Sequence, residues 1–180
     1  MRIPKEDCLA VTIDVQEKLL PHMVGNESLL FNTELLIQGL HILDVPQVLT
    51  EQYPKGLGAS VYGIGVLFEG KQTIEKSAFS CCDDTTFEAM VKASDKRFVL
   101  LSGIETHVCV VQTALDLLSW GKVPVVVANC TSSRKLEDKE FALRRMEQAG
   151  VILTTYESIL LELCRDSKSP AFKAILDLIK

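Results

Sequence analysis

Cys109 is the residue of this chain whose position best suits nucleophilic chemistry. It closes the segment 103–109, between an apolar run that ends at Ser102 and a helical repeat that begins at Val111. This spacing places the thiol at the opening turn of a helix that follows a strand. Because a helix N-terminus lowers the pKa of a thiol, we expect Cys109 to be an activated thiolate.

The other five cysteines fit structural roles better. Cys8, Cys130 and Cys164 lie within or beside apolar runs, where a cysteine behaves as a small buried hydrophobe. Cys81 and Cys82 are adjacent, which is too close for metal-ligand spacing, and we expect them in a loop. Six cysteines in a chain of this size fit a reducing compartment better than a disulfide scaffold, so we predict a cytoplasmic protein.

Two charged residues end predicted strands and join the thiol as candidates. Asp14 follows the apolar run 9–13, and Lys76 ends the run 73–76. In an open α/β sheet, ligands bind beyond the carboxyl ends of the strands, so both side chains would face a site there. The sequence alone leaves alternatives open, because Asp14 could cap a helix and Lys76 could be a solvent-facing strand end.

The elements that must position these residues alternate along the whole chain. Short β-rich runs are separated by amphipathic helical stretches, a pattern typical of parallel strands joined by helical crossovers. We predict a three-layer α/β/α, Rossmann-like fold, with a six-stranded mostly parallel sheet and helices on both faces. The predicted strands are residues 8–14, 47–51, 73–76, 97–102, 123–128 and 151–154.

Apolar residues at helical spacing indicate the helices between these strands. Gly121 and Gly150 end two of them, residues 83–85 can cap the helix after the third strand, and Ser169 with Pro170 opens a final helix. The predicted buried faces are Leu29, Leu36, Leu40 and Leu43; Phe87, Met90 and Val91; and Val111, Leu115 and Leu118.

The stretch from 52 to 70 has no periodicity and carries five glycines. It is longer than a structural connector needs to be, and we interpret it as a functional loop or lid.

Composition narrows the class of protein. The chain has 180 residues, 47% hydrophobic and 24% charged, with a formal net charge of -5. This suits one domain over residues 1–180 and gives a phosphate backbone little to attract, so we expect no nucleic acid partner. No apolar run approaches the roughly 20 residues of a membrane helix, and no secretory signal is visible, so we expect a soluble protein without a membrane partner.

Asp14, Lys76 and the segment 103–109 together resemble the isochorismatase-like cysteine hydrolases. The resemblance covers nearly the whole chain, and segments 50–58, 75–80 and 132–134 resemble the isochorismatase-domain-containing subgroup. It implies that Asp14 takes the thiol proton and Cys109 attacks a carbonyl or related carbon, which forms a thioester-like intermediate. Lys76 would hold the other two residues in register.

The same resemblance implies several further features. A cis peptide bond would join Ile104 to Glu105, and the backbone N-H groups of Glu105 and Cys109 would form an oxyanion hole. It also implies a homo-oligomer, for which the apolar segment 171–179 is a candidate surface unless it packs on its own domain.

Two departures from the wider family narrow the chemistry. Its nicotinamidase branch binds a metal through an Asp-x-His pair and a later histidine, whereas residues 51–53 here read Glu-Gln-Tyr. The histidines, His22, His41 and His107, are too scattered to assume a shared site, so we predict neither a metal nor a cofactor. The second departure is Asn129-Cys130, where the subgroup has an acidic residue before alanine.

Gln16, Tyr53, Leu57 and Phe79 are the predicted substrate-binding residues, because they follow strand ends near the proposed triad. Leu57 and Phe79 could equally belong to the core. Such a lining would suit a small, partly apolar amide, ester or enol ether. Two other functions remain open: a catalytically silent binding or interaction protein on the same fold, and redox sensing by Cys109 or the Cys81-Cys82 pair.

Overall fold

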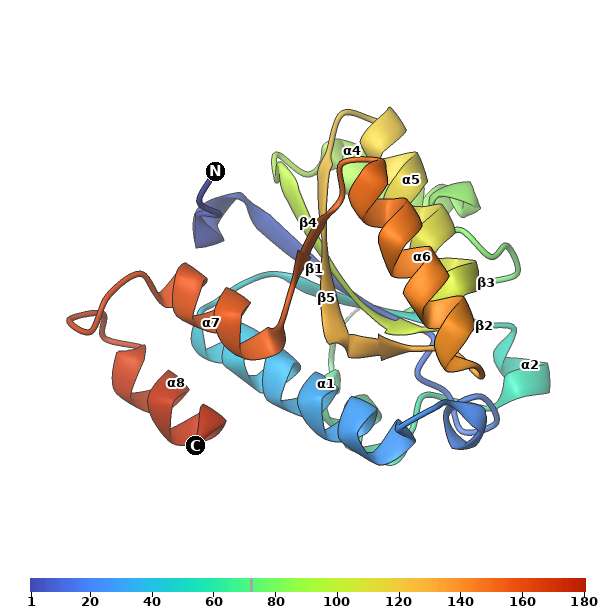
Figure 1. Cartoon of the computed structure of the whole chain (residues 1–180), viewed down its shortest axis with the longest axis horizontal. Helices are drawn as coiled ribbons and strands as arrows, with labels where there is room; N and C mark the ends of the chain where they lie inside the picture. The colour runs from blue at the N-terminus through green and yellow to red at the C-terminus, as the bar shows by residue number, and fades with distance from the viewer. Residues whose placement is uncertain (72) are drawn as a thin grey trace.

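A six-stranded sheet forms the centre of the molecule (Figure 1). The computed structural model describes residues 1–71 and 73–180. All strand pairs are parallel, and the order across the sheet is β3-β2-β1-β4-β5-β6. The strands are β1 (Cys8–Ile13), β2 (Gln47–Gln52), β3 (Thr73–Lys76), β4 (Phe98–Ile104), β5 (Val123–Ser132) and β6 (Ile152–Thr154).

Helices cover both faces of this sheet, which confirms the predicted fold class (Figure 1). One face carries α1 (Asn26–Ile42), α7 (Tyr156–Cys164) and α8 (Phe172–Ile179), and the other carries α4 (Thr85–Ala93), α5 (Val111–Ser119) and α6 (Leu136–Gln148). Shorter elements are α2 (Pro54–Leu57), α3 (Tyr62–Leu67), three 3-10 turns (Lys5–Asp7, Leu20–His22 and Cys81–Asp83) and a π-helix (Thr106–Val110).

The two helical layers bury separate apolar cores against the sheet. Phe87, Leu117 and Met146 pack on one face, whereas Leu40 and Leu160 pack on the other. Every residue of β1 and β4 is buried, as expected for central strands covered on both faces. The central strands are therefore held rigidly, and so are the residues at their ends.

The strand order contains a topological switch point between β1 and β4. Moving outward from this point, the chain adds β2 and β3 on one side and β5 and β6 on the other. Open sheets of this order leave a crevice at the carboxyl ends of the two strands that flank the switch. Asp14 directly follows β1, and Cys109 follows β4 by five residues.

Several predicted strand boundaries were wrong by one to four residues. β1 stops at Ile13, because Asp14 has a φ of 54° and leaves the extended conformation. β4 and β5 run further than predicted because Ile104 still pairs with Ser132, beyond an irregularity in register after Leu101. Additional pairing of this kind depends on the neighbouring strand and has no local sequence signal.

Some helix predictions also need correction. In α5 the predicted residues Val111, Leu115 and Leu118 all pack on the core, but Leu115 and Leu118 are only half-buried, and the fully buried Ala114 and Leu117 were not predicted. The last helix begins at Phe172 rather than at Ser169-Pro170.

Two segments predicted as loops contain helical structure. The stretch 52–70 contains α2 and α3, which makes it more ordered than the predicted loop or lid. Cys81 and Cys82 lie in a buried 3-10 turn. Among the residues described, no helix has both the length and the apolar character that crossing a bilayer would require.

Gly103 provides a test of how closely β1 and β4 approach at the switch point. Its φ is 110°, and a Cβ at this position would lie 1.9 Å from the Ile13 carbonyl oxygen. Gly103→Ala is expected to lower the free energy of unfolding by more than about 4 kcal/mol or to prevent folding. Gly121→Ala is the matched control. The φ of Gly121 is also positive, but a Cβ built there would have no atom within 4 Å apart from its own chain neighbours.

Chemical denaturation of the parent and both variants measures the change in the free energy of unfolding. The control should lose only about 1–2 kcal/mol, the cost of a left-handed alanine. Equal losses in the two variants would contradict the close approach of the strands.

Candidate active site

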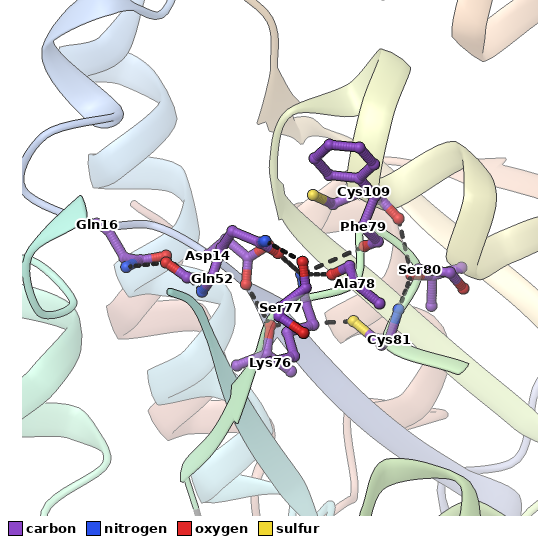
Figure 2. Close-up of polar contacts among 12 residues, drawn as sticks. Asp14, Gln16, Gln52, Lys76, Ser77, Ala78, Phe79, Ser80, Cys81 and Cys109 are labelled. Atoms are coloured by element: carbon purple, nitrogen blue, oxygen red, sulfur yellow. Dashed lines mark hydrogen bonds and ion pairs between the residues drawn. The ribbon is translucent and has the colours of Figure 1, made fainter. Parts of the chain in front are cut away.

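Asp14 is completely buried at the end of β1, and both of its carboxylate oxygens have partners (Figure 2). Thr50, at the neighbouring position on β2, donates its hydroxyl to Oδ1 at 2.7 Å. The Lys76 ammonium donates to Oδ2 at 2.6 Å. A buried carboxylate needs such compensation, so Asp14 is a charged group held in one orientation rather than a solvent-exposed helix cap.

Lys76 reaches Asp14 from the edge strand β3, two strands away. Its side chain is 1% exposed, and its Nζ contacts the Asp14 carboxylate, Gln52 Oε1 at 2.7 Å, and the carbonyl oxygens of Ala78 and Phe79 at 3.2 Å each. Burial lowers the pKa of Lys76, but the Asp14 charge and the nearby thiols outweigh burial and raise it. The solvent-facing alternative for Lys76 is wrong, and the lysine is a fixed buried cation.

Cys109 lies within the π-helix that precedes α5, and it is 6% exposed. Its carbonyl accepts a hydrogen bond from Thr113 Oγ1 at 2.7 Å. Burial first, and then the charge of the nearby Asp14 carboxylate, raise the pKa of the thiol to about 12, while Lys76 lowers it. The expectation of a lowered pKa is wrong because desolvation and the Asp14 carboxylate together exceed the opposing effect of the lysine.

This arrangement supports proton transfer within the site. The Asp14 carboxylate, whose hydrogen-bond partners are a hydroxyl and an ammonium, lies near enough to the Cys109 thiol to raise its pKa, so the thiol is neutral near neutral pH. A carboxylate at this position can act as a general base, and the cation reduces the cost of placing a thiolate beside it. The geometry therefore allows the Cys109 thiol to lose its proton as it attacks a substrate, rather than requiring a thiolate before the substrate binds.

Gln16 has a different environment from the one predicted for a substrate-binding residue. It is fully buried, and its Nε2 donates to the carbonyls of Gln52 at 3.0 Å and Gly58 at 2.7 Å. Its Oε1 accepts the Gln52 backbone N-H at 2.7 Å. Through these hydrogen bonds the Gln16 amide holds Gln52 and Gly58, which lie on either side of α2, in place.

The other predicted binding residues remain at the edge of the site. Tyr53 and Phe79 are 58% and 57% exposed, and Leu57 is half-buried. A cavity of about 330 Å³ is lined by Tyr53 and Lys76 together with Pro54, Lys55, Glu75, Ser77 and Asp84. Tyr53 and Phe79 are thus available to a ligand, and core packing does not account for either ring.

The turn before Cys109 carries the predicted oxyanion-hole residues. The Ile104–Glu105 peptide bond is cis, and the Glu105 carbonyl accepts the backbone N-H groups of Val108 and Val110. The Glu105 carboxylate accepts Arg134 Nε at 2.9 Å. Hydrogen bonds therefore hold both the backbone and the side chain of Glu105 in place.

The residues considered for a metal site are separated by the fold. His22 lies in a 3-10 turn, His41 at the end of α1, and His107 in the π-helix, where its Nδ1 is 2.9 Å from Ser133 Oγ. The Glu51 carboxylate accepts the Ser60 backbone N-H at 2.7 Å. Within residues 1–71 and 73–180, no group of three or more His, Cys, Asp or Glu side chains is arranged to hold a metal ion.

Asn129 and Cys130 connect elements on the α1 and α7 side of the sheet. Asn129 accepts the Tyr156 backbone N-H through Oδ1 at 2.9 Å and the Asn32 side chain through its carbonyl at 3.0 Å. Cys130 is completely buried in the core of that layer. The two residues have structural contacts that account for them without a ligand.

Thr50, Gln52 and Thr113 belong to the site but carry no recognisable motif. Thr50 binds Asp14, Gln52 binds Lys76, and the Thr113 hydroxyl joins the Cys81 backbone N-H to the Cys109 carbonyl. Position at a predicted strand end could have suggested Thr50 and Gln52. Nothing in the sequence distinguishes Thr113 from other helical threonines.

The fold and the switch-point site define the class as a doubly wound parallel α/β protein. The isochorismatase domain model matches residues 8–158, and the chain belongs to this family of hydrolases. The resemblance seen in the sequence is confirmed.

Three similar proteins illustrate the relationship. The chain is 39% identical to isochorismatase domain-containing protein 2 of Danio rerio over 178 residues, which are 99% of this chain and 89% of that protein. It is 39% identical to the MAR1 ribonuclease structure from Caenorhabditis elegans, with a TM-score of 0.91 and coverage of 99% and 92%. YcaC from Pseudomonas aeruginosa, solved with hexane-2,5-diol and covalent acrylamide, is 26% identical, with a TM-score of 0.92 and coverage of 98% and 91%.

The buried ion pair predicts a large and non-additive loss of stability. Lys76→Met leaves the Asp14 charge without its cation and is expected to cost about 3–5 kcal/mol. The double variant Asp14→Asn with Lys76→Met removes both charges, so its loss should be clearly smaller than the sum of the single losses. Urea unfolding of the parent and three variants gives the coupling energy. Additive losses would contradict a direct buried pair.

The raised pKa of Cys109 predicts the pH dependence of its alkylation. Because the pKa is about 12, against an ordinary 9.0, the thiolate fraction keeps increasing above pH 9. The rate of carbamidomethylation should rise roughly tenfold per pH unit up to about pH 10 without levelling. Peptide mass spectrometry measures the rate at Cys109, and glutathione, a thiol with an ordinary pKa, is alkylated in parallel as the reference. A plateau at or below about pH 9 would show that the pKa is not raised.

Proposed function

We propose that this protein is a cysteine hydrolase that cleaves a small amide, ester or related substrate through a covalent thioester-type intermediate. The observation that carries the proposal is that the buried Cys109 thiol lies within electrostatic reach of the buried Asp14 carboxylate, which is itself paired with Lys76. The residues are those that base-assisted attack by a thiol requires. Membership in a family of hydrolases supports the reaction type.

In the proposed first step, the Cys109 thiol gives its proton to the Asp14 carboxylate, and the sulfur attacks the substrate carbonyl carbon. The C-N or C-O bond then breaks, and the leaving group takes the proton from Asp14. Backbone N-H groups of Glu105 and Cys109 would stabilise the negative oxygen, as oxyanion holes do in acyl transfer. Water next attacks the thioester, releases the acid and restores the thiol.

Lys76 has an electrostatic role in this proposal. All of its short contacts are acceptors within the chain, so it holds Asp14 in place and favours negative charge on the sulfur. Tyr53, Leu57 and Phe79 would contact the substrate, and Gln16 would position the segment that carries Tyr53. We propose no metal or cofactor, because residues 51–53 offer no Asp-x-His pair and the histidines lie on separate elements.

Burial of the nucleophile favours a small substrate over an RNA strand. Cys109 is 6% exposed, and the chain has a formal net charge of -5. A polyanion gains little from such a surface. One similar structure is named a ribonuclease, so RNA belongs among the tested substrates. The covalent acrylamide of the YcaC structure supports a small electrophile as the probe.

The direct test is turnover of a library of small amides, esters and enol ethers together with single-stranded RNA. Cys109→Ala should lower hydrolysis of the preferred small substrate by about three orders of magnitude or more. Cys164→Ala is the matched control, because this buried cysteine belongs to the core on the other face of the sheet. Acid quenching should trap an acyl group on Cys109, detected by peptide mass.

The outcomes separate the competing functions. Turnover that survives Cys109→Ala would contradict the proposed nucleophile, and RNA cleavage without small-molecule turnover would replace the substrate class. Binding without turnover would favour the silent interaction protein. The predicted homo-oligomer and cytoplasmic location stay predictions.

A further inference from the structure

We propose that Gln52 is a positioning residue whose neutral side-chain amide fixes the charge balance around Cys109 through Lys76. The inference rests on the proposed function for the reaction that Cys109 carries out. Its structural basis is independent of any substrate, because it concerns the contacts of a buried lysine in the resting site.

The Gln52 amide has one orientation toward Lys76. Its Oε1 accepts a hydrogen bond from Nζ at 2.7 Å, and its Nε2 donates to the Ser77 carbonyl at 2.6 Å (Figure 2). An amide turned by 180° would place its NH₂ group against the ammonium and its oxygen against a carbonyl. Both of those contacts would be repulsive, so the observed orientation is enforced.

Gln52 and Asp14 provide the two short contacts of the Lys76 ammonium. The remaining acceptors are the carbonyls of Ala78 and Phe79, both at 3.2 Å. The Asp14 carboxylate is the charged member of this set, and Gln52 the neutral side chain. Lysine and aspartate therefore sum to zero charge, and a thiolate on Cys109 would be the one uncompensated anion.

A second contact fixes the backbone of Gln52. The buried Gln16 amide accepts the Gln52 N-H at 2.7 Å and donates to its carbonyl at 3.0 Å. Gln52 is thus fixed through both its backbone and its side chain, although it is half-buried and near the cavity that Tyr53 lines. A residue fixed this firmly at its position can hold Lys76 at a constant distance from Asp14.

The test compares two substitutions at Gln52 that differ in the charge they place beside Lys76. Gln52→Glu places a second carboxylate on Lys76, whereas Gln52→Met removes the acceptor without adding charge. With iodoacetamide as the probe at about pH 8, Cys109 in Gln52→Glu should react about tenfold more slowly than in Gln52→Met, and its pH profile should move upward. Gln148→Glu, an exposed site at the end of α6, is the control for added charge.

A purely structural role predicts another result. Equal alkylation rates in Gln52→Glu and Gln52→Met, with the pH profile of the parent, would overturn the inference and leave the proposed hydrolase intact. The Cys109→Ala turnover assay tests that function separately. If Gln52→Glu does not fold, Gln52→Asn carries the test, because it withdraws the amide oxygen without changing charge.

Gln52→Asn has its own expected and contrary results. Alkylation of Cys109 should slow about threefold or more while the rates at the other five cysteines stay unchanged. An unchanged rate at Cys109, or the same change at all six cysteines, would overturn the inference.

Discussion

The ion pair between Asp14 and Lys76 is the constraint on which the site depends. A carboxylate and an ammonium, 0% and 1% exposed, can be buried together only if each satisfies the other and the remaining polar partners complete their hydrogen bonds. Thr50 does this for Asp14, and Gln52 with two backbone carbonyls does it for Lys76. The pair thereby ties the edge strand β3 to the central strand β1 across β2.

The sheet topology converts this local pair into a reactive arrangement. β1 and β4 are neighbours at the switch point, so the residue that follows β1 meets the turn that follows β4. Gly103 permits this because a side chain there would collide with the Ile13 carbonyl. Cys109 lies 95 residues after Asp14 in the chain, and their proximity requires the strands to lie closely side by side.

The raised pKa of Cys109 changes how the site is understood. A thiol at a helix start suggests a permanent thiolate, but burial and the Asp14 charge keep it protonated. In the proposed reaction the carboxylate would serve as the base, and the lysine would limit the free-energy cost of forming the anion. A thiol of this kind is compatible with membership in a hydrolase family.

The sequence by itself determined the fold class and the identity of Asp14, Lys76 and Cys109 as candidates, because hydrophobic periodicity and strand ends are local properties. It did not determine the ends of β4 and β5, which residues of α5 are fully buried, or the structural role of Gln16, since these depend on strand register and on partners far away in the chain. The pKa of Cys109 was decided by tertiary structure for the same reason: desolvation and the distance to a charge exist only once the chain is folded.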